Sequence, residues 1–253
     1  MNLDFLSAGA AAADGAVAHT PMEAKARAAG ARFELRDGWN VAHAYAAGAE
    51  EEARAAARTA GWADVSHLGK LELQGPPEEL DRIASECGAE LRLGEAGRAG
   101  DAWWCRLTTT RALVVCEARV SDTLRTQLAQ ASAGAERVTV TEVTTNFAAM
   151  TLVGPQAREV FARFCALDLR PGVTPVRALR PGSIARQPGI LIREAEDRYL
   201  FLFGWATGEY VWSVVADAGE HLGARPIGVD ALTALPKAGG VGAERETEET
   251  LSA

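Results

Sequence analysis

The chain has 253 residues, 48% hydrophobic and 24% charged, which is the balance of a globular protein with apolar material for one large or two modest cores. Its net charge is −8 and its pI about 5.2, so it lacks the basic surface that binding to nucleic acid needs. No apolar run approaches the ~20 residues of a membrane span, so neither nucleic acid nor a membrane is an expected partner.

Residues 1–20 are rich in alanine, but they carry Asp4 and Asp14 and have no Lys or Arg before the alanines. A secretory signal would need a basic start, so we expect a mobile leader and a cytoplasmic chain. The four cysteines show no C-x-x-C spacing and no His at a ligand interval. No metal site is therefore expected.

Helix and strand signals alternate after this leader. Residues 21–30 start with Pro, continue through helix formers and end at Gly, which predicts a short helix. Residues 31–40 predict a strand that ends in a turn at Asp37-Gly38. Residues 49–60 predict a second helix, because acidic residues occupy its first turn, where the helix dipole favours them.

Residues 61–75 combine a strand with polar residues that do not fit its pattern. Leu71 and Leu73 alternate with polar residues, which predicts a half-buried strand. Three hydrogen-bonding residues come directly before that alternation: Asp64, Ser66 and His67. Their side chains either cap a local turn or line a site, and the strand pattern alone leaves both open.

The order strand, Gly-Pro, helix occurs twice in the chain. It is seen first around Gly-Pro at 75–76 and again around Gly-Pro at 154–155. Two such units predict two related modules, residues 21–137 and 138–235. Strands and helices are intermixed, and no Gly-rich phosphate loop or Gly-x-Ser-x-Gly motif is present, which favours the α+β class.

The remaining elements follow the same signals. Residues 103–120 predict two strands, and residues 121–134 predict a helix with Ser121 as its N-cap. Residues 189–204 predict a hairpin that turns around Glu194 to Arg198. A helix is predicted over 206–223, with these side chains facing inward: Tyr210, Val211, Val214 and Val215. Residues 236–253 lack apolar content and predict a disordered tail.

Several stretches resemble the aminomethyltransferases of the glycine-cleavage T-protein family: "TPMEAKARAAGARFELRDGWNVAHAY", "GWADVSHLGKLELQG" and "LVGPQAREVF". Their order and spacing match over roughly residues 20 to 235. The second half, with "ARFCALDLRPG" and "EYVWSVVADAGEHLG", is similar to the gamma subunit of heterotetrameric sarcosine oxidase. The resemblance implies a compact folate-binding aminomethyltransferase with two modules around a central cavity, and we expect the C-terminal barrel of the T protein to be absent.

The resemblance implies tetrahydrofolate as cofactor. In the family the Asp-Val-Ser-His segment enters the cavity and the next residue contacts the pterin, which implies Ser66, His67 and Leu68 as cofactor-binding residues. The alternative for Ser66 and His67 is a hydrogen-bonded local turn.

The other implied site residues come from two further matches. Aligning "DAWWCRLTTTRALVV" with the Asp-rich strand pair of the family needs one gap and implies Asp101 as the catalytic residue; otherwise Asp101 is a turn residue. Trp103 and Trp104 point to opposite faces of a strand, and Trp103 is the candidate for the cavity. Aligning "REAEDRYLFLF" with the family's Gly-Glu-x-Gly-Tyr-Glu motif implies Glu196 and Tyr199 as pterin-binding residues. That motif is degraded here, so a solvated hairpin turn is the alternative.

The resemblance thus implies a tetrahydrofolate-dependent one-carbon (methyl, methylene or aminomethyl) transferase with a small-molecule carbon donor or acceptor. A non-catalytic, gamma-like subunit that packs against a larger flavoprotein is the first alternative. A scaffold of the same fold that binds another small molecule is the second, because fold alone does not fix function.

Overall fold

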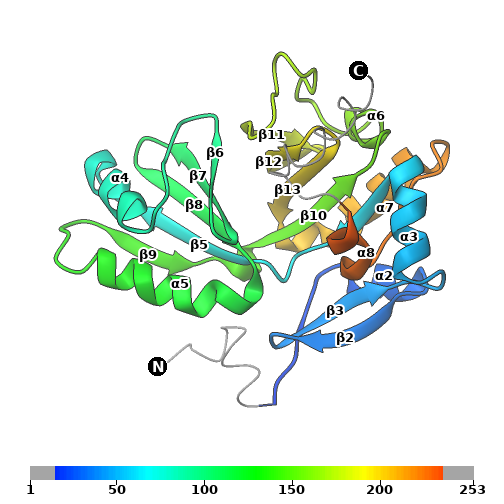
Figure 1. The fold of residues 1–253 in the computed structure, drawn as a ribbon, viewed down its shortest axis with the longest axis horizontal. Coiled ribbons are helices and arrows are strands. Elements are labelled where there is room, and N and C mark those ends of the chain that lie inside the picture. The colour runs from blue at the N-terminus through cyan, green and yellow to red at the C-terminus, as the bar shows by residue number, and fades with distance from the viewer. Residues whose placement is uncertain (1–14, 236–253) are drawn as a thin grey trace, which may run out of the picture.

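The computed structural model describes residues 15–235, which form three sheets and the helices that cover them (Figure 1). The five-stranded sheet has the order β6-β7-β8-β5-β9, with the bounds Ala96–Ala99, Ala102–Thr108, Arg111–Cys116, Gly69–Gln74 and Thr139–Glu142. The six-stranded sheet has the order β11-β12-β13-β10-β4-β14, with the bounds Leu179–Ile184, Gln187–Ala195, Arg198–Gly204, Phe147–Val153, Gly61–Asp64 and Arg225–Pro226. The small sheet has the order β1-β3-β2, with the bounds Ala18–His19, Trp39–Ala44 and Arg32–Arg36.

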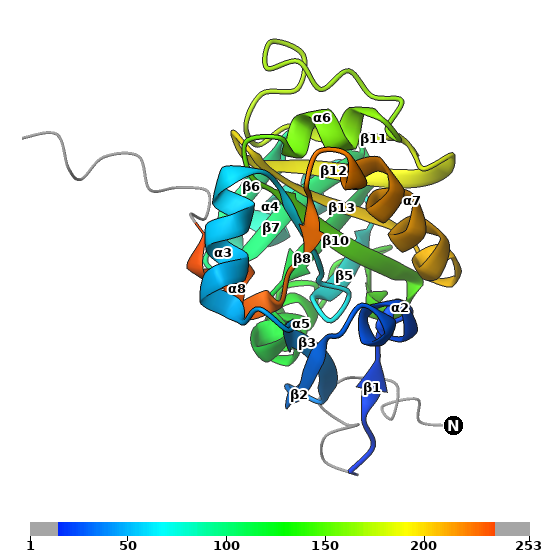
Figure 2. The same cartoon turned by 90° about the vertical axis from the view of Figure 1, so that its right-hand side faces the viewer.

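The α-helices are α2 (Glu23–Ala28), α3 (Ala49–Arg58), α4 (Pro77–Glu86), α5 (Ala118–Ala131), α6 (Ala157–Ala162), α7 (Gly208–Glu220) and α8 (Val229–Ala234). Two 3-10 turns, η2 (Thr144–Asn146) and η3 (Trp205–Thr207), precede β10 and α7. Helices α3 and α8 pack against each other and contact β3 and β4 (Figure 2). Within residues 15–235 no helix is long and apolar enough to cross a membrane.

The two strand–Gly-Pro–helix units head two similar series of elements. One runs β5-α4-β6-β7-β8-α5-β9 and the other β10-α6-β11-β12-β13-α7-β14, which agrees with the predicted α+β class. Gly154 has φ +116°, and a Cβ there would lie 2.3 Å from the carbonyl oxygen of Ala56. This turn therefore requires glycine.

The two large sheets exchange strands. β4 precedes β5 in the chain but lies in the six-stranded sheet, and β9 precedes β10 but lies in the five-stranded sheet. Two connections therefore pass between the sheets in opposite directions, and we call them together the sheet crossover: residues 64–70 and 143–149. The predicted module boundary at 137/138 precedes β9, so the sheets do not divide the chain there.

Side chains from both large sheets form one apolar layer between them, which includes Val65, Trp103, Leu113, Ile192 and Leu202. The outer face of the five-stranded sheet packs against α4 and α5, and Leu71 and Leu73 belong to that core. β5 is therefore buried on both faces, and the expectation of a half-buried strand was wrong. Lys70 and Glu72 are buried because the second sheet covers the side of β5 that the pattern left to solvent.

Three smaller expectations need correction. α5 begins at Ala118, so Ser121 lies inside its first turn and does not cap the helix. Tyr210 is 46% exposed, because Trp212 occupies the buried face of α7 beside Val211 and Val215. Ala18 and His19, inside the predicted leader, form β1, which pairs in parallel with β3.

The rest of the predicted leader and the predicted tail, residues 1–14 and 236–253, lie outside the described residues. The cytoplasmic location expected from the leader stays a prediction.

Candidate functional site

Polar residues that come before β5 lie in the sheet crossover. Val65 N–H donates to the carbonyl of Ala149 at 2.9 Å, and Val143 N–H donates to the carbonyl of Lys70 at 2.8 Å, so the two connections run side by side. Leu68 N–H donates to the carbonyl of Val65 at 3.1 Å and closes a turn. The Val-Ser-His-Leu segment is therefore a tight turn at the point where the chain changes sheets.

Asp64 and Ser66 fix the start of this turn. Asp64 is buried, and its carboxylate accepts from the Thr20 hydroxyl at 2.5 Å and from the Ser66 N–H at 2.9 Å. Burial raises the pKa of Asp64, while these hydrogen bonds and the charge of Lys70 act in the opposite direction. The Ser66 hydroxyl accepts from the Ala149 N–H at 3.0 Å, so the side chains of Asp64 and Ser66 are used within the crossover.

Lys70 is fully buried beneath the same turn. Its Nζ donates to the carbonyls of Ser66 at 2.8 Å, Leu68 at 2.9 Å and Thr144 at 3.5 Å. Burial lowers the pKa of Lys70 to about 7, although the nearby Asp64 and Cys116 favour the charged form.

Two buried polar atoms in this region have no hydrogen-bond partner: Nδ1 of His67 in the turn, and the hydroxyl of Tyr45, which follows β3 and is near enough to Asp64 to be affected by its charge. Burial, followed by the positive charges of Lys70 and Arg36, lowers the pKa of His67 to about 4, so its imidazole is neutral near pH 7. Burial and then the carboxylates of Asp64 and Glu52 raise the pKa of Tyr45. Orphaned buried polar atoms are uncommon in folded proteins, and a catalytic role or a bound water or ion is among the explanations for them.

Leu68 ends this turn, and Asp101 lies near it. Leu68 is half-buried against the apolar layer between the sheets. Asp101 is exposed in the β6–β7 turn, where it forms an ion pair with Arg119. Ala102 is paired with Cys116, which is paired with Gly69, so Asp101 is at the same end of the five-stranded sheet as the turn. Ala102 and Gly69 are separated by two strand spacings, which is about 10 Å.

Trp103 is buried between the sheets. Its Nε1 donates to the Glu194 carboxylate at 2.8 Å, and the guanidinium of Arg98 stacks 4.9 Å from its ring centroid. The other oxygen of Glu194 accepts from Arg198 at 2.9 Å, and Arg198 also donates to the carbonyl of Leu232 at 3.2 Å. Trp103 thus links β7 to β12 and β13.

Glu196 and Tyr199 do not lie at the crossover. Glu196 is exposed in the β12–β13 turn. Tyr199 is buried on the opposite face of β13 from Arg198 and packs against Phe161, with ring centroids 5.7 Å apart. Its hydroxyl donates to the main-chain carbonyl of Glu196 at 3.3 Å. Their roles as pterin-binding residues stay predictions from the degraded motif.

The sequence reasoning missed Glu194, Arg198, Lys70 and Tyr45. A signal for Glu194 was present, because Ile190, Ile192 and Glu194 alternate along β12 and therefore face one side. No local pattern identifies Lys70 or Tyr45, since the groups around them come from distant segments.

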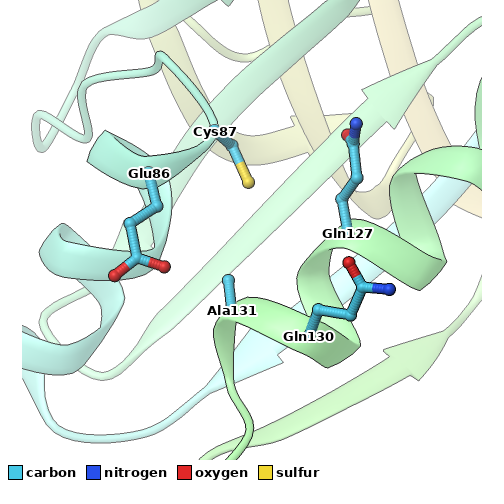
Figure 3. Close-up of a pocket in the computed structure, with 5 residues that line it drawn as sticks. All are labelled: Glu86, Cys87, Gln127, Gln130 and Ala131. Carbon is cyan, nitrogen blue, oxygen red and sulfur yellow. The ribbon is translucent and has the colours of Figure 1, made fainter.

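A separate hollow of about 450 Å³ lies between α4 and α5 (Figure 3). It is lined by Glu86, Cys87, Gln127, Gln130 and Ala131. Burial and the Glu86 charge raise the pKa of Cys87, so the thiol is not an activated nucleophile. Among the described residues, no group of three or more His, Cys, Asp or Glu could hold a metal ion.

Known proteins similar to this chain are aminomethyltransferases. A family model described as the GCVT N-terminal domain matches residues 22–240. An aminomethyltransferase from Saccharopolyspora erythraea is 27% identical over 231 residues, which cover 85% of this chain and 62% of that protein. An aminomethyltransferase from Corynebacterium aurimucosum is 26% identical over 236 residues, which cover 86% of this chain and 63% of that protein. The chain thus spans about three fifths of the length of the curated relatives it matches, and the predicted resemblance to aminomethyltransferases is confirmed.

Two solved structures share the fold. Glycine cleavage system aminomethyltransferase T from Bartonella henselae superposes with a TM-score of 0.69 at 19% identity, covering 85% of this chain and 61% of that one. A chain of heterotetrameric sarcosine oxidase from Corynebacterium sp. U-96, solved with pyrrole 2-carboxylate, gives a TM-score of 0.61 at 23% identity. That match covers 69% of this chain and 92% of the other.

Proposed function

The chain belongs to the GCVT N-terminal domain family, and from this premise we propose that it binds a reduced folate at the sheet crossover and transfers a one-carbon unit. The observation that carries the proposal is the neutral His67, whose buried Nδ1 has no partner although the carbonyls of Ser66 and Leu68 on either side of it accept hydrogen bonds from Lys70. A ligand with polar ring atoms would satisfy that nitrogen. Asp101 at the same end of the sheet supports the proposal.

The residues at the crossover fit part of what tetrahydrofolate needs. His67 Nδ1 and the Tyr45 hydroxyl offer hydrogen bonds to a heterocycle, and Leu68 offers an apolar contact. A pterin also needs a carboxylate that accepts its ring N–H groups. Asp101 can provide it, because an exposed ion pair such as that with Arg119 contributes only about 0–1 kcal/mol and can be given up. Glu194 does not fit, since both of its oxygens already accept hydrogen bonds.

In this proposal tetrahydrofolate would supply the nitrogen atoms that carry the one-carbon unit. The chain would hold and orient it. His67 would provide a neutral hydrogen-bonding ring, the carbonyl-bound turn would fix that ring in place, and Asp101 would accept a ligand N–H or move a proton.

Calorimetric titration with 5-formyltetrahydrofolate tests the proposal. Even a Kd of about 1 mM corresponds to about −4 kcal/mol and is measurable at high protein concentration. We expect saturable heat with the wild-type protein and at least tenfold weaker binding with His67→Ala. The absence of any heat at millimolar ligand would contradict folate binding.

A gamma-like subunit of a larger flavoprotein complex is the second candidate, and a different observation favours it. Leu93, Val173 and Val176 are 60%, 46% and 46% exposed. The two loops that carry these residues are both hydrogen-bonded to Arg180, which donates to the carbonyls of Gly94 at 2.6 Å and Val173 at 2.9 Å. Gathered apolar residues of this kind are typical of interaction surfaces. The matched chain of the heterotetrameric sarcosine oxidase, covered to 92%, supports the same candidate.

Light scattering tests this second candidate. If the apolar surface normally contacts a partner, the isolated chain should self-associate at high concentration, and Leu93→Ser with Val173→Ser should reduce that association. A monodisperse wild-type monomer at all concentrations would count against the candidate.

A further inference from the structure

Lys70 has an unusual environment for a buried cation. Its side chain is fully buried, and each hydrogen bond of its ammonium goes to a main-chain carbonyl and none to a carboxylate. Burying a charge without a hydrogen-bonded counter-ion is costly, and an apolar residue could fill the same space at lower cost. Stability therefore does not explain why a lysine occupies this position.

The three carbonyls that bind Lys70 come from the turn that contains His67 and from the segment that crosses beside it. Those of Ser66 and Leu68 lie directly before and after His67 in the turn, and that of Thr144 lies in the other connection of the crossover. The Lys70 N–H also donates to the Thr144 hydroxyl at 3.1 Å. One side chain thus holds both flanks of His67 and ties them to the segment that crosses in the opposite direction.

We propose that Lys70 is the positioning residue of the site: its ammonium holds the 65–68 turn against Thr144 and so presents the ring of His67 to the ligand. The ligand part of this inference rests on the folate binding proposed above. Burial has the largest effect in lowering the pKa of His67, and the positive charge of Lys70 acts in the same direction.

Titratable groups face Lys70 from each neighbouring element. They are Asp64 on β4, Cys116 on β8, His67 in the turn and, through the hydroxyl of Thr144, Glu142 on β9. Asp64 and Cys116 favour the ammonium, whereas burial favours the neutral amine. Opening of the turn would return Lys70 to water, where its pKa is 10.5, so opening should take up a proton and become less favourable as the pH rises above about 7.

The test compares Lys70→Met with Glu72→Gln by hydrogen exchange and by titration with 5-formyltetrahydrofolate. Glu72 is the matched control, because it is also buried on β5 but bonds to Arg111 and Gln74, outside the crossover. We expect Lys70→Met to raise exchange in residues 64–70 and 143–149 together and to weaken folate binding at least tenfold. Glu72→Gln should leave exchange in 143–149 and folate binding unchanged. Lys70→Gln, which keeps a donor, should restore part of the protection.

Exchange in the wild-type protein keeps the inference testable if Lys70→Met does not fold. Protection factors in both segments should rise together as the pH increases from about 7 to about 9, because an opening that exposes Lys70 takes up a proton. Independence of pH there, or increased exchange in 64–70 alone with Lys70→Met, would overturn the role of Lys70. The wild-type protein could bind no folate while Lys70→Met still lowers protection in both segments together. In that case the proposed function fails, and the positioning of the turn by Lys70 stands.

Discussion

The polar cluster between the large sheets and the polar residues at and beside the sheet crossover differ in how completely they are hydrogen-bonded. In the cluster of Trp103, Glu194 and Arg198, the indole N–H donates to one carboxylate oxygen and the guanidinium to the other. At and beside the sheet crossover, His67 Nδ1 and the Tyr45 hydroxyl have no partner. An unsatisfied buried polar group costs about 1–3 kcal/mol. The first cluster therefore serves to hold the sheets together, whereas the second has polar atoms that the fold itself does not use.

The largest effect on stability is expected from breaking the satisfied cluster. Glu194→Ala leaves Arg198 buried without its carboxylate and removes the partner of Trp103, which should lower the free energy of unfolding by about 3–5 kcal/mol. Glu196→Ala, two residues away in an exposed turn, should change it by no more than about 0.5 kcal/mol. Urea unfolding measures both, and equal effects would show that Glu194 does not join the sheets.

The pH dependence of stability should distinguish the crossover from that cluster. The pKa of Lys70 is about 7 in the folded chain and 10.5 in the reference state, so the unfolded chain binds more protons between these values. The free energy of unfolding should therefore rise with pH from about 7 to 10.5, by at most about 1.4 kcal/mol per pH unit. Denaturant titrations at several pH values should show this slope in the wild type and its loss in Lys70→Met. The same slope in both proteins would be evidence against a buried, titrating Lys70.

His67 should contribute on the acid side. Its pKa falls from 6.5 to about 4 on folding, so the unfolded chain binds more protons between pH 4 and 6.5, and stability should fall as the pH drops through that range. His67→Gln should reduce this loss, with His221→Gln at an exposed position as the control. Thermal unfolding at pH 4.5 and at pH 7 measures this loss of stability in each protein. An identical acid loss in His67→Gln would mean that His67 is not buried as a neutral ring.

The smallest effect on stability is expected at Asp101. Asp101→Asn removes one exposed ion pair with Arg119 and should change the free energy of unfolding by no more than about 0.5 kcal/mol. If Asp101 acts as an acid or base in one-carbon transfer, the rate should fall about 10²–10⁴-fold. Unchanged turnover and unchanged folate affinity would remove Asp101 from the site and favour the subunit candidate.

Local patterns predicted most of the elements correctly, because helix formers, Gly-Pro turns and alternating residues act within a few positions. The helix at 49–60, the two Gly-Pro units and the hairpin at 189–204 are examples. The strand exchange between the sheets was not predictable in this way. It depends on pairing between β4 and β10 and between β5 and β9, whose residues lie far apart in the chain.

The candidate site was predicted only where a motif marked it. Asp64, Ser66 and His67 stood out because polar residues interrupt a strand pattern, and they do meet at the crossover. Lys70 did not stand out, since it fits the polar phase of the alternation and only the second sheet makes it buried. Glu196 and Tyr199 were assigned from a degraded motif, and the alternation along β13 places Tyr199 on the face away from the crossover.

The most direct test of the central claim is hydrogen exchange of the wild-type protein with and without saturating 5-formyltetrahydrofolate. If the ligand binds at the crossover, protection should increase in residues 64–70 and around Tyr45, with no change in the α4–α5 hollow around Cys87. Protection confined to other segments, or none in residues 64–70 at a concentration that saturates binding, would contradict the assignment of the site.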